Sequence, residues 1–133
     1  MITKGEKMKK ILVAAFIFAM TLSANSFADI KMGIILGFTG PIESLTPAMR
    51  DSARLAFQEA SDSGSLLGGE KISVLEGDST CVDSAAATAA AEKMISDGVA
   101  AIMGADCSGV TGAIATNVAV PNGCLLYTSD AAD

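Results

Sequence analysis

Apolar runs of strand length alternate with amphipathic stretches of helix length along residues 29–123 of the chain. Residues 30–38 open with alternating polar and apolar positions and then become continuously apolar, which predicts a strand buried on both faces of a parallel sheet. Residues 71–76 alternate as a second strand, and residues 99–103 are apolar throughout and predict a third. Turn-forming residues follow each run, so we expect three separate strands.

A first helix is predicted directly after the loop that follows residues 30–38. Thr46 is expected as its N-cap, with Pro47 in the first helical position. Apolar residues then recur on one stripe at helical spacing, which predicts the face that packs on the sheet. The members of this stripe are Met49, Ala53, Ala56, Phe57 and Ala60.

Two further helices follow the second and third strands. Asp83 or Ser84 is expected to cap a helix that runs to about residue 96, and Gly98 stands just past its end. Residues 110–119 predict the last helix. The turn at residues 121–123 then leads to the place where a fourth strand should begin.

The order of these elements predicts the fold class. Strands that alternate with helices form a parallel α/β sheet with right-handed crossovers and flanking helices. Ligands of such sheets bind beyond the carboxyl ends of the strands. The loops at residues 39–45, 78–83 and 104–111 are therefore the candidate ligand-facing segments.

The first 28 residues predict a secretory signal peptide. A lysine-rich start is followed by an apolar run at residues 11–22, and small residues precede the predicted cleavage after Ala28. The run is shorter than the roughly 20 apolar residues that span a bilayer, which argues against a membrane anchor. Translation could start at Met1 or at Met8. In either case the mature chain is expected to begin at Asp29.

The composition excludes several classes of function. The chain has no His, so neither a Ser-His-Asp nor a Cys-His catalytic set can be assembled from it. Its net charge is −6 and it lacks Trp and a basic patch, so nucleic-acid binding is not expected. Residues 37–40 do not form a dinucleotide-binding G-x-G-x-x-G motif, and no cofactor is expected. Asp78 and Asp83 have turn and N-cap roles that need no catalytic explanation, so the chain is not expected to be an enzyme.

Two cysteines lie at the same predicted edge of the sheet. Cys81 follows the second strand and Cys107 follows the third. If the first strand lies between these two, short loops can bring the Cα atoms to the roughly 5.5–6 Å that a disulfide needs. The exported context allows the bond, with two free buried thiols as the alternative. A metal site is not expected, because two Cys without His fall short of four ligands.

The ordered set of motifs is similar to a known protein family. The matching segments are Ile30-Lys31-Met32-Gly33, Phe38-Thr39-Gly40-Pro41, Gly77-Asp78-Ser79-Thr80-Cys81 and Gly104-Ala105-Asp106-Cys107-Ser108-Gly109-Val110-Thr111. Through them the chain resembles the type 1 periplasmic solute-binding proteins of ABC importers, in particular the branched-chain amino acid (Leu/Ile/Val) branch. The resemblance implies that residues 29–123 are the N-terminal part of lobe I of such a protein.

The resemblance also implies the site residues. In that family the two cysteines of the matching loops form a disulfide, which implies a Cys81–Cys107 bond. Ser108 resembles the residue that holds the α-carboxylate of the bound amino acid, and an N-cap role for Ser108 is compatible with this. Thr39 lies in a loop that faces the ligand. Leu45 stands in the same loop where the best-known members have Tyr, so aliphatic amino acids, amides and other small carboxylates all stay open as ligands.

The resemblance ends after Gly123. Residues 124–133 supply the only Tyr and the odd third Cys, and they look like an in-frame translation of a sequencing adapter. We therefore predict a non-native tail at 124–133, with a genuine short C-terminus as the alternative. Because residues 29–123 hold only the first half of one lobe, the chain is expected to bind no amino acid tightly by itself.

The function implied by the resemblance is that of an extracytoplasmic receptor. It would bind an amino acid in the periplasm and deliver it to an ABC permease in the inner membrane, as a monomer when full length. Two alternatives stay open. One is the ligand-sensing domain of a receptor of the same fold, and the other is a secreted α/β enzyme whose catalytic part lies outside this sequence.

Overall fold

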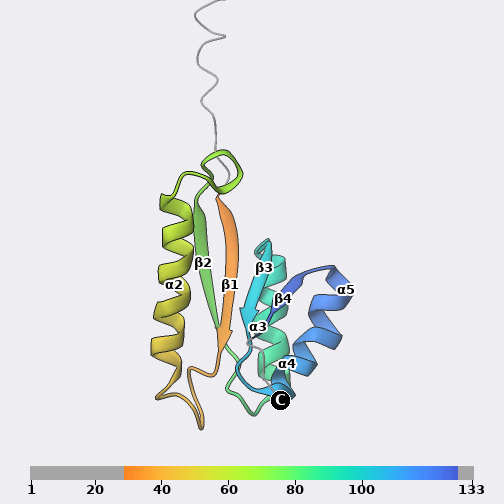
Figure 1. Ribbon diagram of the computed structural model, residues 1–133. Coiled ribbons are helices and arrows are strands. Elements are labelled where there is room, and N and C mark those ends of the chain that lie inside the picture. The colour runs from red at the N-terminus through yellow and green to blue at the C-terminus, as the bar shows by residue number, and fades with distance from the viewer. Residues whose placement is uncertain (1–28, 129–133) are drawn as a thin grey trace, which may run out of the picture.

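A computed structural model gives the fold of residues 29–128 (Figure 1). Its strands are β1 (Ile30–Leu36), β2 (Ile72–Asp78), β3 (Ala101–Gly104) and β4 (Leu125–Tyr127). Its longer helices are α2 (Thr46–Asp62), α3 (Ser84–Ser96) and α4 (Ser108–Ile114), and α4 continues through a π-helical stretch η2 (Ala115–Ala119) into α5 (Val120–Asn122). A short 3₁₀ turn, η1 (Leu66–Gly68), precedes β2. The predicted leader and residues 129–133 of the predicted tail lie outside the described residues.

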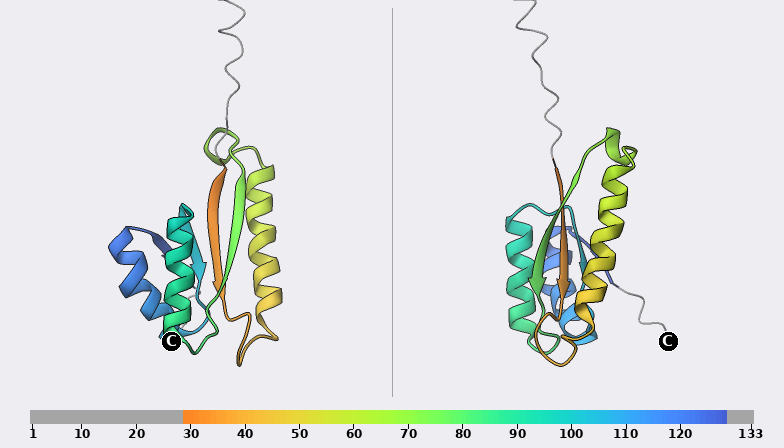
Figure 2. Two further views of the ribbon diagram at one scale, coloured as in Figure 1. Left: turned by 180° about the vertical axis from the view of Figure 1, so that it is seen from behind. Right: turned by 90° about the vertical axis from the view of Figure 1, so that its left-hand side faces the viewer.

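The strands form one parallel sheet in the order β2-β1-β3-β4. This confirms the predicted α/β class, and it confirms that β1 lies between the two strands that precede the cysteines. Helix α2 lies on one face of the sheet, and α3 and the helical run from α4 to α5 lie on the other (Figure 2). In the described part of the chain, no helix is both long and apolar enough to cross a membrane.

The main core lies under α3 and α4. Ile35 of β1 and Ile102 of β3 are fully buried there, because α3 and α4 cover this face of the sheet. Helix α3 contributes two alanines and a methionine, and α4 and η2 contribute branched residues. These helical core residues are Ala87, Ala91, Met94, Val110, Ile114 and Val118.

Helix α3 has the ends that its sequence predicts. The Asp83 carboxylate accepts hydrogen bonds from the backbone N–H groups of Ala85 and Ala86, at 2.9 and 3.1 Å. It thereby satisfies donors that have no partner inside the helix. Gly98, one residue past the C-cap, has a φ of +82°, which fits the predicted helix end.

The predicted cap of α2 is wrong. The helix begins at Thr46 itself, Leu45 occupies the N-cap position, and no side chain caps the helix. The Thr46 side chain is fully buried, and its hydroxyl lies 3.3 Å from the Gly37 carbonyl oxygen and 3.2 Å from that of Glu43. The hydroxyl therefore fastens the start of α2 to the end of β1 instead of to its own helix.

The boundaries of several other elements also differ from the predictions. Strand β1 ends at Leu36 instead of residue 38, and β3 covers Ala101–Gly104 instead of residues 99–103. Strand β2 extends to Asp78, because it pairs with β1 along its whole length. The last helical run starts at Ser108 and reaches Asn122, where Gly123 ends it with a φ of +62°. The predicted turn at residues 121–123 is thus mostly helical. Residues 125–127, within the predicted tail, form the expected fourth strand beside β3.

Candidate ligand-binding site

Three loops meet at the carboxyl edge of the sheet, at the lower end of the molecule in Figure 1. They follow β1, β2 and β3 and lead into α2, α3 and α4. All strands of a parallel sheet end at the same edge, so these loops become neighbours although they are far apart in the sequence. This is the edge at which the sequence predicts ligand binding.

A disulfide joins the second loop to the third. Cys81 and Cys107 are bonded, with their Cα atoms 5.3 Å apart. This confirms the pairing and rules out the alternative of two free thiols. The third cysteine, Cys124, is free, and burial raises the pKa of its thiol, which keeps it in the less reactive protonated form.

The first loop lies tightly against the second at Gly40. This residue has a φ of +100°, and a Cβ added to it would lie 2.5 Å from the carbonyl oxygen of Thr80. Only glycine fits so close to another backbone segment in this conformation. On the other side of the contact, Thr80 and Cys81 themselves have φ values of +55° and +67°.

A single carboxylate, that of Asp106, connects all three loops. One oxygen accepts a hydrogen bond from the backbone N–H of Gly37 at 2.8 Å, and the other lies 3.4 Å from the hydroxyl of Ser79, which is fully buried. Asp106 was not among the predicted site residues. The signal that could have found it is a charged residue directly before Cys107 in a loop at the ligand-facing edge.

A second carboxylate, that of Asp78, connects the first two loops. It accepts hydrogen bonds from the Thr39 hydroxyl at 2.6 Å and from the backbone N–H groups of Thr80 at 2.8 Å and Thr39 at 3.3 Å. Partial burial alone would raise the pKa of Asp78, but these hydrogen bonds outweigh it and hold the pKa below its ordinary value of 3.8. The loops therefore stabilise the ionised form of this side chain.

The substitution Asp78→Asn is expected to remove a pH-dependent part of the stability. Because the folded-state pKa lies below the unfolded value, the ionised carboxylate stabilises the fold fully above the unfolded pKa, and this contribution is lost as the pH falls through the folded pKa. The free energy of unfolding, measured with urea, should therefore differ more between the wild type and the variant at neutral pH than at an acid pH below the ordinary pKa of Asp.

The partner variant Thr39→Val serves as the control for Asp78. It keeps the carboxylate but removes its shortest hydrogen bond, so the pH dependence should weaken without disappearing. A difference between wild type and Asp78→Asn that is the same at both pH values would contradict the role given to this carboxylate.

The remaining predicted ligand residues lie around this junction of loops. Ser108 is exposed as the first residue of α4, directly after the disulfide, and its hydroxyl makes no hydrogen bond to another described residue. The hydroxyl of Thr111 donates to the carbonyl oxygens of Ala105 and Cys107 and so fixes the first turn of α4. Leu45 is 62 % exposed at the start of α2, and no described contact joins it to Ser108.

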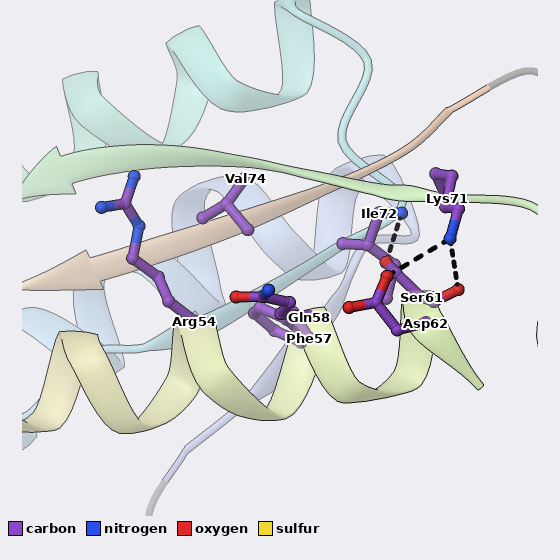
Figure 3. A pocket seen from close by; sticks show the side chains of 8 residues that line it. All are labelled: Arg54, Phe57, Gln58, Ser61, Asp62, Lys71, Ile72 and Val74. Atoms are coloured by element: carbon purple, nitrogen blue, oxygen red, sulfur yellow. Dashed lines mark hydrogen bonds and ion pairs between the residues drawn. The ribbon is translucent and has the colours of Figure 1, made fainter.

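A cavity of about 500 Å³ lies elsewhere, between α2 and β2 (Figure 3). Its cations are already paired: Arg54 Nε lies 2.9 Å from Glu76 Oε1, and Lys71 Nζ lies 3.3 Å from Asp62 Oδ1. None of the predicted ligand residues lines it, so we do not assign the ligand to this cavity. Within residues 29–128, no three His, Cys, Asp or Glu side chains gather into a group that could hold a metal ion.

The chain is similar to a curated amino acid binding protein. The Leu/Ile/Val-binding protein BraC3 of Rhizobium johnstonii is 30 % identical over 122 residues, which are 92 % of this chain and 32 % of that protein. The chain thus spans about a third of the length of this curated relative.

Solved structures agree with this similarity. A leucine-binding protein LivK from Thermotoga maritima matches with 26 % identity and a TM-score of 0.64, over 74 % of this chain and 27 % of its own. The branched-chain amino acid binding protein LivJ of Streptococcus pneumoniae, solved with isoleucine, matches with 25 % identity and a TM-score of 0.68, over 78 % of this chain and 30 % of its own. An ABC-type branched-chain amino acid transporter protein from Rhodopseudomonas palustris matches with 27 % identity and a TM-score of 0.67, over 79 % and 28 %.

The family assignment follows from a match that covers every described residue. The family model called periplasmic binding protein matches residues 29–133, the whole chain after the predicted leader. The four-stranded parallel sheet with its flanking helices agrees with that match, since it superposes on part of solved binding proteins. This chain belongs to the periplasmic binding protein family.

Proposed function

We propose that this chain is the N-terminal part of an extracytoplasmic receptor for branched-chain or related amino acids, which hands its ligand to an ABC permease in the inner membrane. The observation that carries the proposal is the junction of three loops at the carboxyl edge, with Ser108 exposed directly after the disulfide. The leader would export the chain to the periplasm, where a disulfide is stable.

Ser108 has the chemistry that an amino acid carboxylate requires. Its hydroxyl has no partner among the described residues, and the first N–H groups of the helical run from α4 to α5 point toward the same end. Hydroxyl and backbone N–H donors at a helix start favour an anion. Ser108 is therefore proposed to bind the α-carboxylate of the amino acid.

The other two proposed ligand residues have different roles. Thr39 already donates its hydroxyl hydrogen to Asp78, so it can offer a ligand only its remaining acceptor capacity. Leu45 presents an exposed apolar side chain, which suits the aliphatic part of an amino acid. Together the three residues would form one wall of a binding site.

A chimeric receptor tests this proposal. In it, residues 29–123 of this chain replace the aligned stretch of the Rhizobium johnstonii protein, which supplies the rest of the binding cleft. Calorimetry should then show binding of at least one of leucine, isoleucine and valine, or of a related amide or small carboxylate. The 133-residue chain alone should bind none of them tightly, since it spans only about a third of the relative's length.

The unmodified relative in the same titration serves as the control. Circular dichroism separates a chimera that does not fold from one that folds and does not bind. A folded chimera that binds none of these compounds would contradict the proposed receptor function.

A further inference from the structure

The three loops at the carboxyl edge are joined in pairs by three different connections. The disulfide joins the second loop to the third, and the Asp78 carboxylate joins the first to the second. The Asp106 carboxylate joins the first loop to the third, because it accepts the backbone N–H of Gly37 at 2.8 Å. In the part of the chain that the structure describes, this is the only hydrogen bond between those two loops.

The backbone N–H of Gly37 depends on Asp106 for its hydrogen bond. Gly37 follows the last residue of β1 and is buried, and among the described residues its N–H donates to no backbone carbonyl. A buried N–H without an acceptor would lose its hydrogen bond to water and gain none in return. A Cβ added to Gly37 would lie 3.3 Å from the Cβ of Cys81, so this residue also packs against the disulfide.

Asp106 points into the junction and not toward a ligand. One carboxylate oxygen accepts from Gly37, and the other lies 3.4 Å from the hydroxyl of Ser79, which is fully buried. Asp106 itself is half-buried, whereas Ser108, two positions later, is exposed. Both oxygens of Asp106 thus face partners inside the protein, and its effect on a ligand has to pass through its neighbours.

We propose that Asp106 is a positioning residue for the ligand, an inference that rests on the proposed function. The proposed ligand residues Ser108 and Leu45 lie on the third and the first loop, so their spacing depends on how these two loops are joined. Loops that must be ordered each time a ligand binds lower the affinity. Asp106 reduces this loss, because it holds the segment that carries Ser108 in a fixed place beside the first loop.

The test is the affinity of the chimeric receptor, measured by calorimetry with the compound that the parent chimera binds. Asp106→Ala removes the acceptor of the Gly37 N–H and should weaken binding about tenfold. Asp106→Asn keeps an oxygen that can accept from the same N–H, so it should restore most of the affinity.

The same substitution in a Ser108→Ala background separates positioning from a general effect on the fold. If Asp106 acts by placing the Ser108 hydroxyl, the two single variants lose the same interaction. The double variant should then bind scarcely more weakly than Ser108→Ala alone. An effect on the fold alone would weaken binding by the same factor in both backgrounds.

Asp83→Ala is the matched control. Its carboxylate lies at the same edge and also accepts from backbone N–H groups, but both donors belong to its own helix, α3. Loss of this cap should lower the urea concentration at which the chimera unfolds and leave its affinity unchanged.

Hydrogen exchange of the Gly37 amide gives a second measurement that needs no ligand. In the exported 133-residue chain this amide should exchange slowly, and in Asp106→Ala about tenfold faster. A Gly37 amide that exchanges in the unsubstituted chain as fast as that of the exposed Ser44 would overturn the inference, whether or not a variant folds.

The affinities distinguish failure of the positioning role from failure of the proposed function. Equal affinity of the folded Asp106→Ala chimera and its parent would overturn the positioning role alone. A loss by the same factor with and without Ser108 would do the same. A folded parent chimera that binds none of the compounds would contradict the proposed function, and the positioning role falls with it.

Discussion

Removal of the disulfide by Cys81→Ser together with Cys107→Ser should lower the free energy of unfolding by about 3 kcal/mol or slightly more. The two cysteines are 26 residues apart in the sequence, and closing a loop of this size restricts mainly the unfolded chain. The bond also joins two loops of the candidate site, so its loss should loosen the edge where Ser108 lies. Urea unfolding measures the change, and free energies extrapolated to water are compared, because opening the loop also alters the unfolded state.

Two controls distinguish the effect of losing the disulfide from the effect of replacing a cysteine side chain. Cys124→Ser removes a thiol that forms no disulfide and should cost less than about 1 kcal/mol. A reducing agent should bring the wild type to the stability of the double variant and leave that variant unchanged. Equal free energies of unfolding for the wild type and the double variant would contradict a stabilising role of the bond.

Gly104→Ala should destabilise the chain by about 3 kcal/mol or more. Gly104 ends β3 with a φ of +132°, and an added Cβ would overlap the carbonyl oxygen of Ile35 in the neighbouring strand. Both partners of that clash belong to the centre of the sheet, so neither can move without breaking the pairing of β1 with β3. Urea unfolding of the purified variant measures the loss.

Gly109→Ala is the matched control for Gly104. Gly109 lies in the first turn of α4, where an added Cβ meets nothing within 4 Å and the backbone has no positive φ. Alanine there should be neutral or slightly stabilising, because it favours the helix. If Gly104→Ala unfolded at the same urea concentration as Gly109→Ala, the close approach of β3 to β1 would not be a real constraint.

The order of strands and helices could be predicted because each element has a clear periodicity. Residues 32–36 and 101–104 carry no charged or polar side chain, because helices cover these strands in the middle of the sheet, and such runs are visible in a single sequence. The N-cap of α3 could be narrowed to Asp83 or Ser84 because an N-cap depends on local sequence, and the structure shows that it is Asp83. The cysteine pair could be placed because parallel strands bring their following loops to one edge.

The hydrogen bonds between loops could not be predicted, since they depend on side chains that are far apart in the sequence. Thr46 has the residue type of an N-cap, but tertiary packing turns its hydroxyl toward Gly37 at the end of β1. Asp106 accepts hydrogen bonds from Gly37 and Ser79, which lie 69 and 27 positions earlier in the chain. No sequence periodicity predicts such an arrangement. The same holds for Thr39, which the sequence marks as facing a ligand and the structure bonds to Asp78.

How much of the sheet α2 covers also could not be predicted from the sequence. The stripe on α2 predicts which face packs on a sheet, but not how many strands the helix covers. Phe57 and Ala53 lie over only part of that face, and together with Met103 and Leu125 they line an apolar cavity of about 380 Å³. The origin of residues 124–133 stays a prediction, although residues 125–127 pair with β3 as a regular strand.

The most direct test of the proposed site is the affinity of the chimeric receptor after the substitution Ser108→Ala. A hydrogen bond to a charged group contributes about 1.5–3 kcal/mol, so loss of the hydroxyl should weaken calorimetric binding of the compound that the parent chimera binds about tenfold or more. Ser96→Ala, which changes an exposed serine at the end of α3, should leave the affinity unchanged. Equal affinity for that compound in the Ser108→Ala chimera and its parent would contradict the site proposed at this edge of the sheet.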